Sequence, residues 1–184
     1  MANNPFAALT RRTVFFSFDF DDMLKTWQVR NSGKFNKKSS YRDGAAFEKA
    51  KLQSDQAIRN WIRREMVGCS VTVVLIGTDT YKSKWVNFEI EESIKEDMGL
   101  VGVNIHKLRG GLLDSKNPTA TAPVNPLYGH KMPATLRSLG TGVDEYAASR
   151  YKTHTWEPAT SALRGFGQND LSAWVNEAAR IAGR

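Results

Sequence analysis

The chain of 184 residues contains one cysteine, Cys69, and no long hydrophobic run. A single cysteine cannot form an internal disulfide, and no metal-ligand spacing surrounds it. Cys69 stands just before an apolar run, which favours a small core residue over a nucleophile. No run approaches the roughly 20 apolar residues that span a bilayer, and residues 1–12 hold no signal-peptide core. We therefore expect a cytoplasmic protein with no membrane partner.

Motifs for several common reaction classes are also missing. The sequence contains no G-x-G-x-x-G, no Walker loop and no G-x-S-x-G elbow, which argues against hydride-transfer and P-loop enzymes. His106, His130 and His154 lie in unrelated contexts and form no ligand spacing. We expect these histidines to be structural or exposed, and we expect no metal site.

Charge is plentiful and of mixed sign, with 26 Lys and Arg against 19 Asp and Glu and a net charge of +7. The basic residues are scattered along the chain rather than gathered in a stripe, and no nucleic-acid-binding motif accompanies them. A basic chain also suits phosphate-bearing small molecules. We therefore expect no nucleic-acid partner.

Three short apolar runs, residues 13–18, 71–76 and 100–105, predict strands. The second run is almost continuously apolar and β-branched, as in a strand of a parallel sheet covered on both faces. Helical patterns alternate with these runs at residues 45–66, 84–98 and 170–182. The order predicts an α/β protein with a doubly wound parallel sheet flanked by helices.

The ends of the predicted helices follow from their flanking residues. The 45–66 pattern is either one broken helix or two, since Ser54 and Asp55 can cap a second helix, and Gly68 is placed to end it. Ser83 is the expected N-cap of the next helix, and Gly99 is its expected stop. Residues 110–126 read as loop, and the structure of residues 128–156 stays open. We expect an extension at 1–11 and a single domain at 12–184 that diverges from about residue 110.

Ser17, Phe18 and Asp19 form the first candidate site, because they end the first predicted strand. Ligands of open parallel sheets gather outside the carboxyl ends of the strands. The alternative interpretation is that Asp21 or Asp22 caps the following helix, while Asp19 lies in a solvated turn.

Trp85 and Glu89 form the second candidate site. Four residues apart in a helix, they lie on one stripe, separated by roughly 40° around the axis. An apolar stripe about 100° away faces the core, formed by Val86, Ile90 and Ile94. Glu89 is therefore expected at the rim of the buried face, partly desolvated but within reach of a ligand. The alternative is a surface acid that complements the helix dipole.

These segments resemble the TIR-like domain family, and within it the ThsB proteins of the Thoeris antiphage system. The opening strand Val-Phe-Phe-Ser-Phe resembles the first strand of TIR domains. Residues 70–78 and 84–90 are similar to the fourth strand and following helix of the family, and they contain the Trp-x-x-x-Glu spacing. Two shorter matches are Lys-x-x-Ser-Asp at 51–55 and Trp-Val-Asn at 174–176.

The resemblance implies a flavodoxin-like fold and cleavage of the nicotinamide–ribose bond of NAD, with NAD as substrate and no cofactor. It implies that Glu89 is catalytic and that Ser17, Phe18, Asp19 and Trp85 line the substrate pocket. The family's products are cyclised or rearranged ADP-ribose signals that reach a separate effector after a phage-derived trigger. The resemblance also implies a homo-oligomer in which a neighbouring subunit supplies a loop, here residues 34–44.

The chemistry suits these residue types. Departure of nicotinamide leaves an oxocarbenium-like ribosyl cation that one carboxylate can stabilise. Aromatic rings can stack on the cationic pyridinium, with a gain of about 0.5–2 kcal/mol. A dry pocket favours cyclic products and an open pocket favours hydrolysis, and this choice stays open. A non-catalytic TIR-type interaction module is the main alternative, and a response-regulator-like flavodoxin fold is a third.

Overall fold

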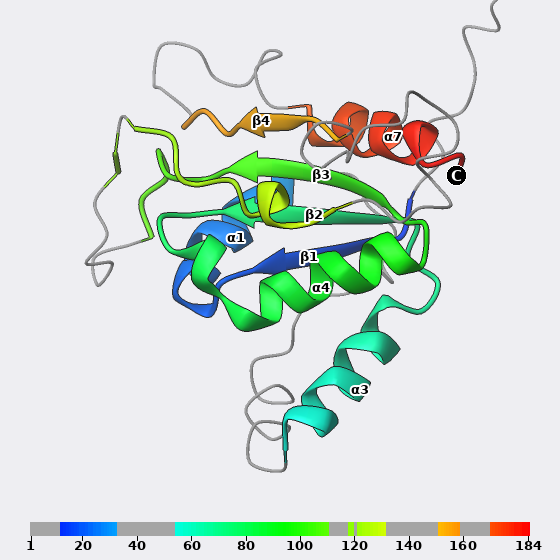
Figure 1. Ribbon diagram of the computed structural model, residues 1–184. Helices are drawn as coiled ribbons and strands as arrows, with labels where there is room; N and C mark the ends of the chain where they lie inside the picture. The colour runs from blue at the N-terminus through cyan, green and yellow to red at the C-terminus, as the bar shows by residue number, and fades with distance from the viewer. Residues whose placement is uncertain (1–11, 33–53, 111–117, 120, 132–150, 159–169) are drawn as a thin grey trace, which may run out of the picture.

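A four-stranded parallel sheet forms the centre of the described part of the chain (Figure 1). The structure, a computed structural model, describes residues 12–32, 54–110, 118–119, 121–131, 151–158 and 170–184. The strands lie in the order β1, β2, β3, β4. Their bounds are Val14–Phe18, Val71–Ile76, Gly99–Asn104 and Thr153–Thr155. All six residues of β2 are fully buried, which explains the nearly continuous apolar run in the sequence.

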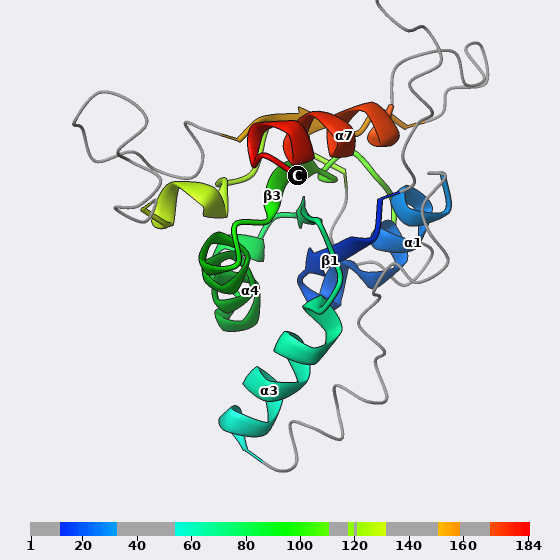
Figure 2. The ribbon, with the colours of Figure 1, turned by 90° about the vertical axis from the view of Figure 1, so that its right-hand side faces the viewer.

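Helices cover both faces of this sheet (Figure 2). One face packs against α1 (Met23–Ser32) and α7 (Leu171–Ile181) through a cluster that includes Phe16, Phe18 and Val29. The other face packs against α3 (Asp55–Met66) and α4 (Lys84–Lys95). The predicted α/β class, a flavodoxin-like doubly wound parallel sheet, is confirmed.

The helices that follow β1 and β2 lie on opposite faces of the sheet. The chain passes from β1 into α1 on one face and from β2 into α4 on the other. The carboxyl ends of β1 and β2 therefore form the topological switch point, where open α/β sheets bind ligands. This arrangement places the first candidate site next to the start of α4.

Helix α3 confirms that Ser54 caps a helix within the 45–66 pattern, while the choice between one broken helix and two stays open. Ser54 is the N-cap, and its hydroxyl accepts a hydrogen bond from the amide of Ala57 at 3.1 Å. Gly68 follows the helix with a φ of +79°, as predicted for the stop. Residues 45–53, the first part of the predicted pattern, lie outside the described residues.

The prediction that Gly99 ends α4 is wrong. The helix ends at Lys95, and Asp97 turns the chain with a φ of +51°. Gly99 is instead the first residue of β3, where a Cβ would lie 2.7 Å from the carbonyl oxygen of Ala178 in α7. A side chain there would clash with backbone, so the close approach of α7 requires glycine.

The C-terminal helix is confirmed at α7, where the Asp170 carboxylate accepts a hydrogen bond from the amide of Ala173 at 2.9 Å. Strand β4 lies in a segment for which the sequence predicted no structure. The extension at 1–11 and the loop at 34–44 lie outside the described residues, so the domain division stays a prediction. None of the helices in the described ranges is long and apolar enough to cross a bilayer.

Candidate active site

Ser17 at the end of β1 contacts Glu89 in α4, 72 residues further along the chain. The Ser17 hydroxyl donates a hydrogen bond to Oε2 of Glu89 at 2.7 Å. Both side chains are fully buried. A separation of 2.7 Å is that of a well-formed O–H···O hydrogen bond. Tertiary structure thus joins one residue from each of the two candidate sites.

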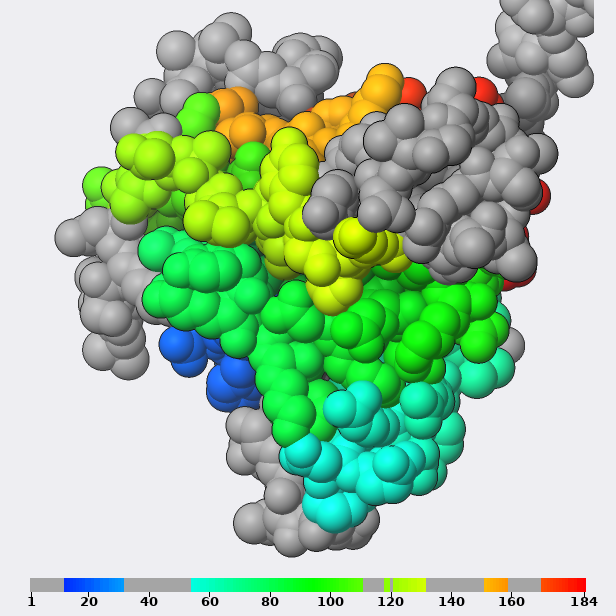
Figure 3. Space-filling view, viewed as in Figure 1, coloured from blue at the N-terminus to red at the C-terminus, as the bar shows by residue number. Residues whose placement is uncertain are grey.

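The predicted position of Glu89 at the rim of the buried face is wrong, because its exposed fraction is 0%. The core stripe of Val86, Ile90 and Ile94 is confirmed. Helix α4 is buried by other segments of the chain as well as by the sheet against which this stripe packs. Phe88 packs against α3, and Leu127, from a turn at Pro126–Gly129, joins the cluster of the core stripe. Figure 3 shows α4 flanked by α3 and by the segment around residue 127.

The other three residues predicted for the pocket lie in different surroundings. The Phe18 side chain is buried in the core cluster on the α1 and α7 face, opposite to the face of Ser17. Asp19 lies at the carboxyl edge and accepts a hydrogen bond from the amide of Asp21 at 3.1 Å. Trp85 is half-buried and meets Phe88 edge to face, with ring centroids 6.5 Å apart. Their pocket role stays a prediction.

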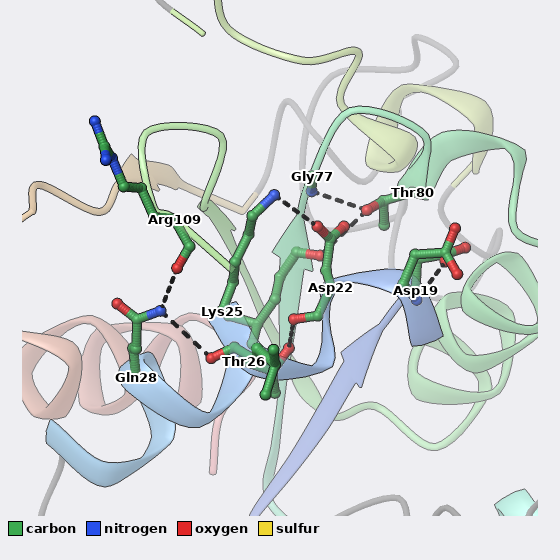
Figure 4. Close-up of polar contacts among 11 residues, drawn as sticks. Asp19, Asp22, Lys25, Thr26, Gln28, Gly77, Thr80 and Arg109 are labelled. Carbon is green, nitrogen blue, oxygen red and sulfur yellow. Dashed lines mark hydrogen bonds and ion pairs between the residues drawn. The ribbon is translucent and has the colours of Figure 1, made fainter. Parts of the chain in front are cut away.

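Asp19, rather than Asp21 or Asp22, is the capping acid, so the capping prediction is wrong. It caps the 3-10 turn Phe20–Asp22 that precedes α1. Asp22 is instead buried and forms an ion pair with Lys25 at 3.2 Å (Figure 4). A lysine three residues after an acid at a helix start was the available sequence signal.

The Asp22 side chain connects the end of β1 to the loop after β2. It lies so close to Gly77 that a Cβ there would be 2.6 Å from Cγ of Asp22. The Gly77 amide donates to the Thr80 hydroxyl at 2.8 Å, and Thr26 donates to the Asp22 carbonyl at 3.1 Å (Figure 4). The contacts of Thr26 and Thr80 are local and structural: the first lies at the start of α1, and the second lies within the loop after β2.

Thr72 and Ser93 are two further buried hydroxyls that the sequence pattern did not single out. Thr72 Oγ1 lies 2.7 Å from Ser93 Oγ, and the Ser93 hydroxyl donates to the backbone carbonyl of Glu89 at 2.7 Å. Both side chains are fully buried. The available signal was that Thr72 is the single polar residue of an otherwise apolar strand.

The histidines have structural surroundings, as predicted. His106 and His130 are buried, and desolvation lowers the pKa of both imidazoles. His154 stacks on Trp174 with ring centroids 4.2 Å apart, and burial lowers its pKa too. Cys69 is a core residue of the α3 cluster. Within the described ranges, no group of three or more His, Cys, Asp or Glu could hold a metal ion.

Comparison with known proteins shows the family of this chain. The family model described as "Thoeris protein ThsB, TIR-like domain" matches residues 15–110, more than half of the chain. One relative, "Putative cyclic ADP-D-ribose synthase ThsB1" of Bacillus cereus (strain MSX-D12), is 34% identical over 114 residues. The match covers 58% of this chain and 59% of the length of that relative. The matched range contains all of β1 but its first residue, together with β2, α4 and the Ser17–Glu89 contact. Because the model matches more than half of the chain, the chain belongs to the family of ThsB TIR-like domains.

Proposed function

We propose that this chain cleaves the nicotinamide–ribose bond of NAD and forms an ADP-ribose-derived signal, with Glu89 as the catalytic carboxylate. The observation that carries the proposal is the 2.7 Å hydrogen bond from Ser17 to Glu89 at the switch point of the sheet. Family membership and the name of the Bacillus cereus relative, "Putative cyclic ADP-D-ribose synthase ThsB1", support the same chemistry.

The reaction requires one well-placed carboxylate from the protein. The N-glycosidic bond breaks, and its electron pair leaves with neutral nicotinamide. The ribosyl carbon becomes an oxocarbenium-like cation, which the Glu89 carboxylate can stabilise. An adenine nitrogen or a ribose hydroxyl of the same molecule then attacks this carbon and releases a proton to solvent to give a cyclic product, whereas attack by water releases the same proton and gives linear ADP-ribose. The hydrogen bond from Ser17 holds the carboxylate in one orientation before the substrate arrives.

Complete burial of Glu89 places a condition on this mechanism. An exposed fraction of 0% means that the substrate meets the carboxylate only after the side chains that cover it move. Closing and opening steps of this kind occur in many enzymes that exclude water from the reaction. We propose that a phage-derived trigger, or assembly of several copies, supplies the movement, and that the product reaches a separate effector by diffusion.

The same burial favours a second function, a non-catalytic interaction module. In that case the contact between Ser17 and Glu89 is a buried structural hydrogen bond, and the chain acts through its surface. The two functions differ in whether NAD is consumed when the protein is activated.

Glu89→Gln tests the proposed function, because the amide keeps the shape of the side chain and removes its charge. We expect nicotinamide release, followed by mass spectrometry in lysates of infected cells, to fall by about 100-fold or more, the scale of losing a charge stabiliser in the transition state. Glu96→Gln is the matched control: it removes an exposed carboxylate just beyond α4 and should keep full activity.

Far-ultraviolet circular dichroism and the urea midpoint show whether Glu89→Gln is folded. Full nicotinamide release in the folded variant overturns the role of Glu89. Absence of any NAD consumption by the wild-type protein, in infected as well as uninfected lysates, overturns the enzymatic function and favours the interaction module.

A further inference from the structure

Four fully buried polar side chains lie between the sheet and α4. Ser17 comes from β1, Thr72 comes from β2, and Glu89 and Ser93 come from α4. Glu89 and Ser93 are one helical turn apart. Thr72 pairs with Phe15 in register, and Phe15 and Ser17 lie two residues apart on one face of β1, so Ser17 and Thr72 lie on the same face of the sheet. Two apolar clusters on this face of the sheet, one around α3 and one around α4, adjoin this row of polar side chains.

The hydrogen bonds between Thr72, Ser93 and Glu89 have a defined direction. A serine hydroxyl carries one proton, and a backbone carbonyl can only accept, so the Ser93 proton goes to the Glu89 carbonyl. Ser93 Oγ must then accept from Thr72 Oγ1 across their 2.7 Å separation. The Met98 sulfur lies 4.0 Å from Thr72 Oγ1 and is a weak acceptor by comparison. These two hydrogen bonds, from Thr72 to Ser93 and from Ser93 to the backbone carbonyl of Glu89, form a relay from β2 to α4.

Glu89 is consequently held at two points by two neighbouring strands. β1 holds its carboxylate through Ser17, and β2 holds its backbone carbonyl through Thr72 and Ser93. A bond from a serine hydroxyl to the carbonyl four residues earlier competes with the helical hydrogen bond and bends a helix slightly. An apolar residue at position 72 would fill the same space, so the hydroxyl adds orientation rather than packing.

We propose that Thr72 and Ser93 are positioning residues for Glu89, an inference that rests on the proposed function. The relay sets the helical turn that carries the carboxylate, and Ser17 sets the carboxylate itself. Loss of the relay therefore displaces Glu89 without removing any group that touches the substrate. Misplacement of a reacting group by about 1 Å can cost about 100-fold in rate. A partial displacement should therefore reduce kcat by much less than about 100-fold.

Thr72→Val tests this proposal, because valine keeps the shape of threonine and lacks the hydroxyl. We expect a loss of about 10-fold in kcat for nicotinamide release with KM nearly unchanged, since substrate contacts remain. Ser93→Ala should have the same effect, and Thr72→Ser should restore activity. Thr26→Val is the matched control. Thr26 is fully buried like Thr72, and its hydroxyl donates to the carbonyl four residues earlier as that of Ser93 does, but it lies in α1 on the opposite face of the sheet.

A second measurement follows Glu89 without any turnover. In protein labelled with ¹³C-glutamate, the carboxyl resonance of Glu89 is identified by its loss in Glu89→Gln. We expect this resonance to move in Thr72→Val and Ser93→Ala, to return in Thr72→Ser, and to stay in place in Thr26→Val. A kcat for Thr72→Val equal to that of Thr26→Val, or an unmoved resonance, overturns the proposal. A wild-type protein without turnover overturns the proposed function. The shift of the Glu89 resonance in Thr72→Val then shows by itself whether Thr72 and Ser93 position the Glu89 side chain.

Discussion

Gly77→Ala should destabilise the protein through a single contact. A Cβ at position 77 would lie 2.6 Å from Cγ and 2.9 Å from Oδ1 of Asp22, and closer still to Oδ2. The Asp22 side chain cannot swing into solvent, because its exposed fraction is 0% and it pairs with Lys25, whose side chain is 3% exposed. The added methyl group therefore has to push the carboxylate away from its partner.

The size of the effect follows from two limits. Overpacking of a well-packed interior costs about 1–3 kcal/mol, and this is the cost if Asp22 and Lys25 shift together. Loss of one partner from a buried ion pair costs about 3–5 kcal/mol, and this is the limit if the pair separates. We expect a loss of about 3 kcal/mol in the free energy of unfolding, between these limits.

Urea denaturation followed by circular dichroism measures this loss. Gly129→Ala is the control, because a Cβ at position 129 would meet nothing within 4 Å, and its effect should stay within about 0.5 kcal/mol. In the background of Asp22→Ala, the additional cost of Gly77→Ala should largely disappear, since the two sites are coupled. A cost below about 1 kcal/mol for Gly77→Ala in the native background would refute the reasoning.

Two further predictions concern helices on the other face of the sheet. Glu92 is 6% exposed, and hydrogen bonds from Arg63 and then Lys95 lower its pKa below the usual range. A lowered pKa in the folded state contributes stability above the unfolded value that is lost as the pH falls through the folded one. Glu92→Gln should thus reduce the free energy of unfolding by about 1 kcal/mol at pH 7. The difference between the variant and the wild type should shrink at acid pH. Equal differences at pH 7 and pH 3 would contradict this reasoning. Ser54→Ala should cost about 0.5–2 kcal/mol by urea denaturation through loss of the cap on Ala57, and Ser54→Asp should keep most of that stability.

The fold class follows from local patterns that the sequence displays directly. An apolar run such as Val71–Ile76 is stable only when both faces of the strand are covered, and the alternation of strands with amphipathic segments implies helices that cover them. The stripe of Val86, Ile90 and Ile94 was predictable for the same reason, because helical periodicity depends on neighbours within a turn or two.

Capping and turn positions were predictable only in part. Ser54 and Gly68 act as expected, because the cap and the positive φ are local properties. Gly99 was misassigned, since its role depends on the carbonyl of Ala178 in a helix that lies far away in the sequence. Asp22 was misassigned for a similar reason, because the loop at Gly77 buries its carboxylate.

The sequence by itself determined that Glu89 follows the second strand on a helix beside a core stripe, and that Ser17 and Phe18 end the first strand. Only the tertiary structure decided which of those two meets α4 and how deeply Glu89 is buried. The reason is physical: helical and strand periods fix directions relative to the local axis, whereas the contacts of Ser17, Thr72 and Leu127 with α4 depend on how distant segments pack. Periodicity orients a side chain, and packing selects its partner.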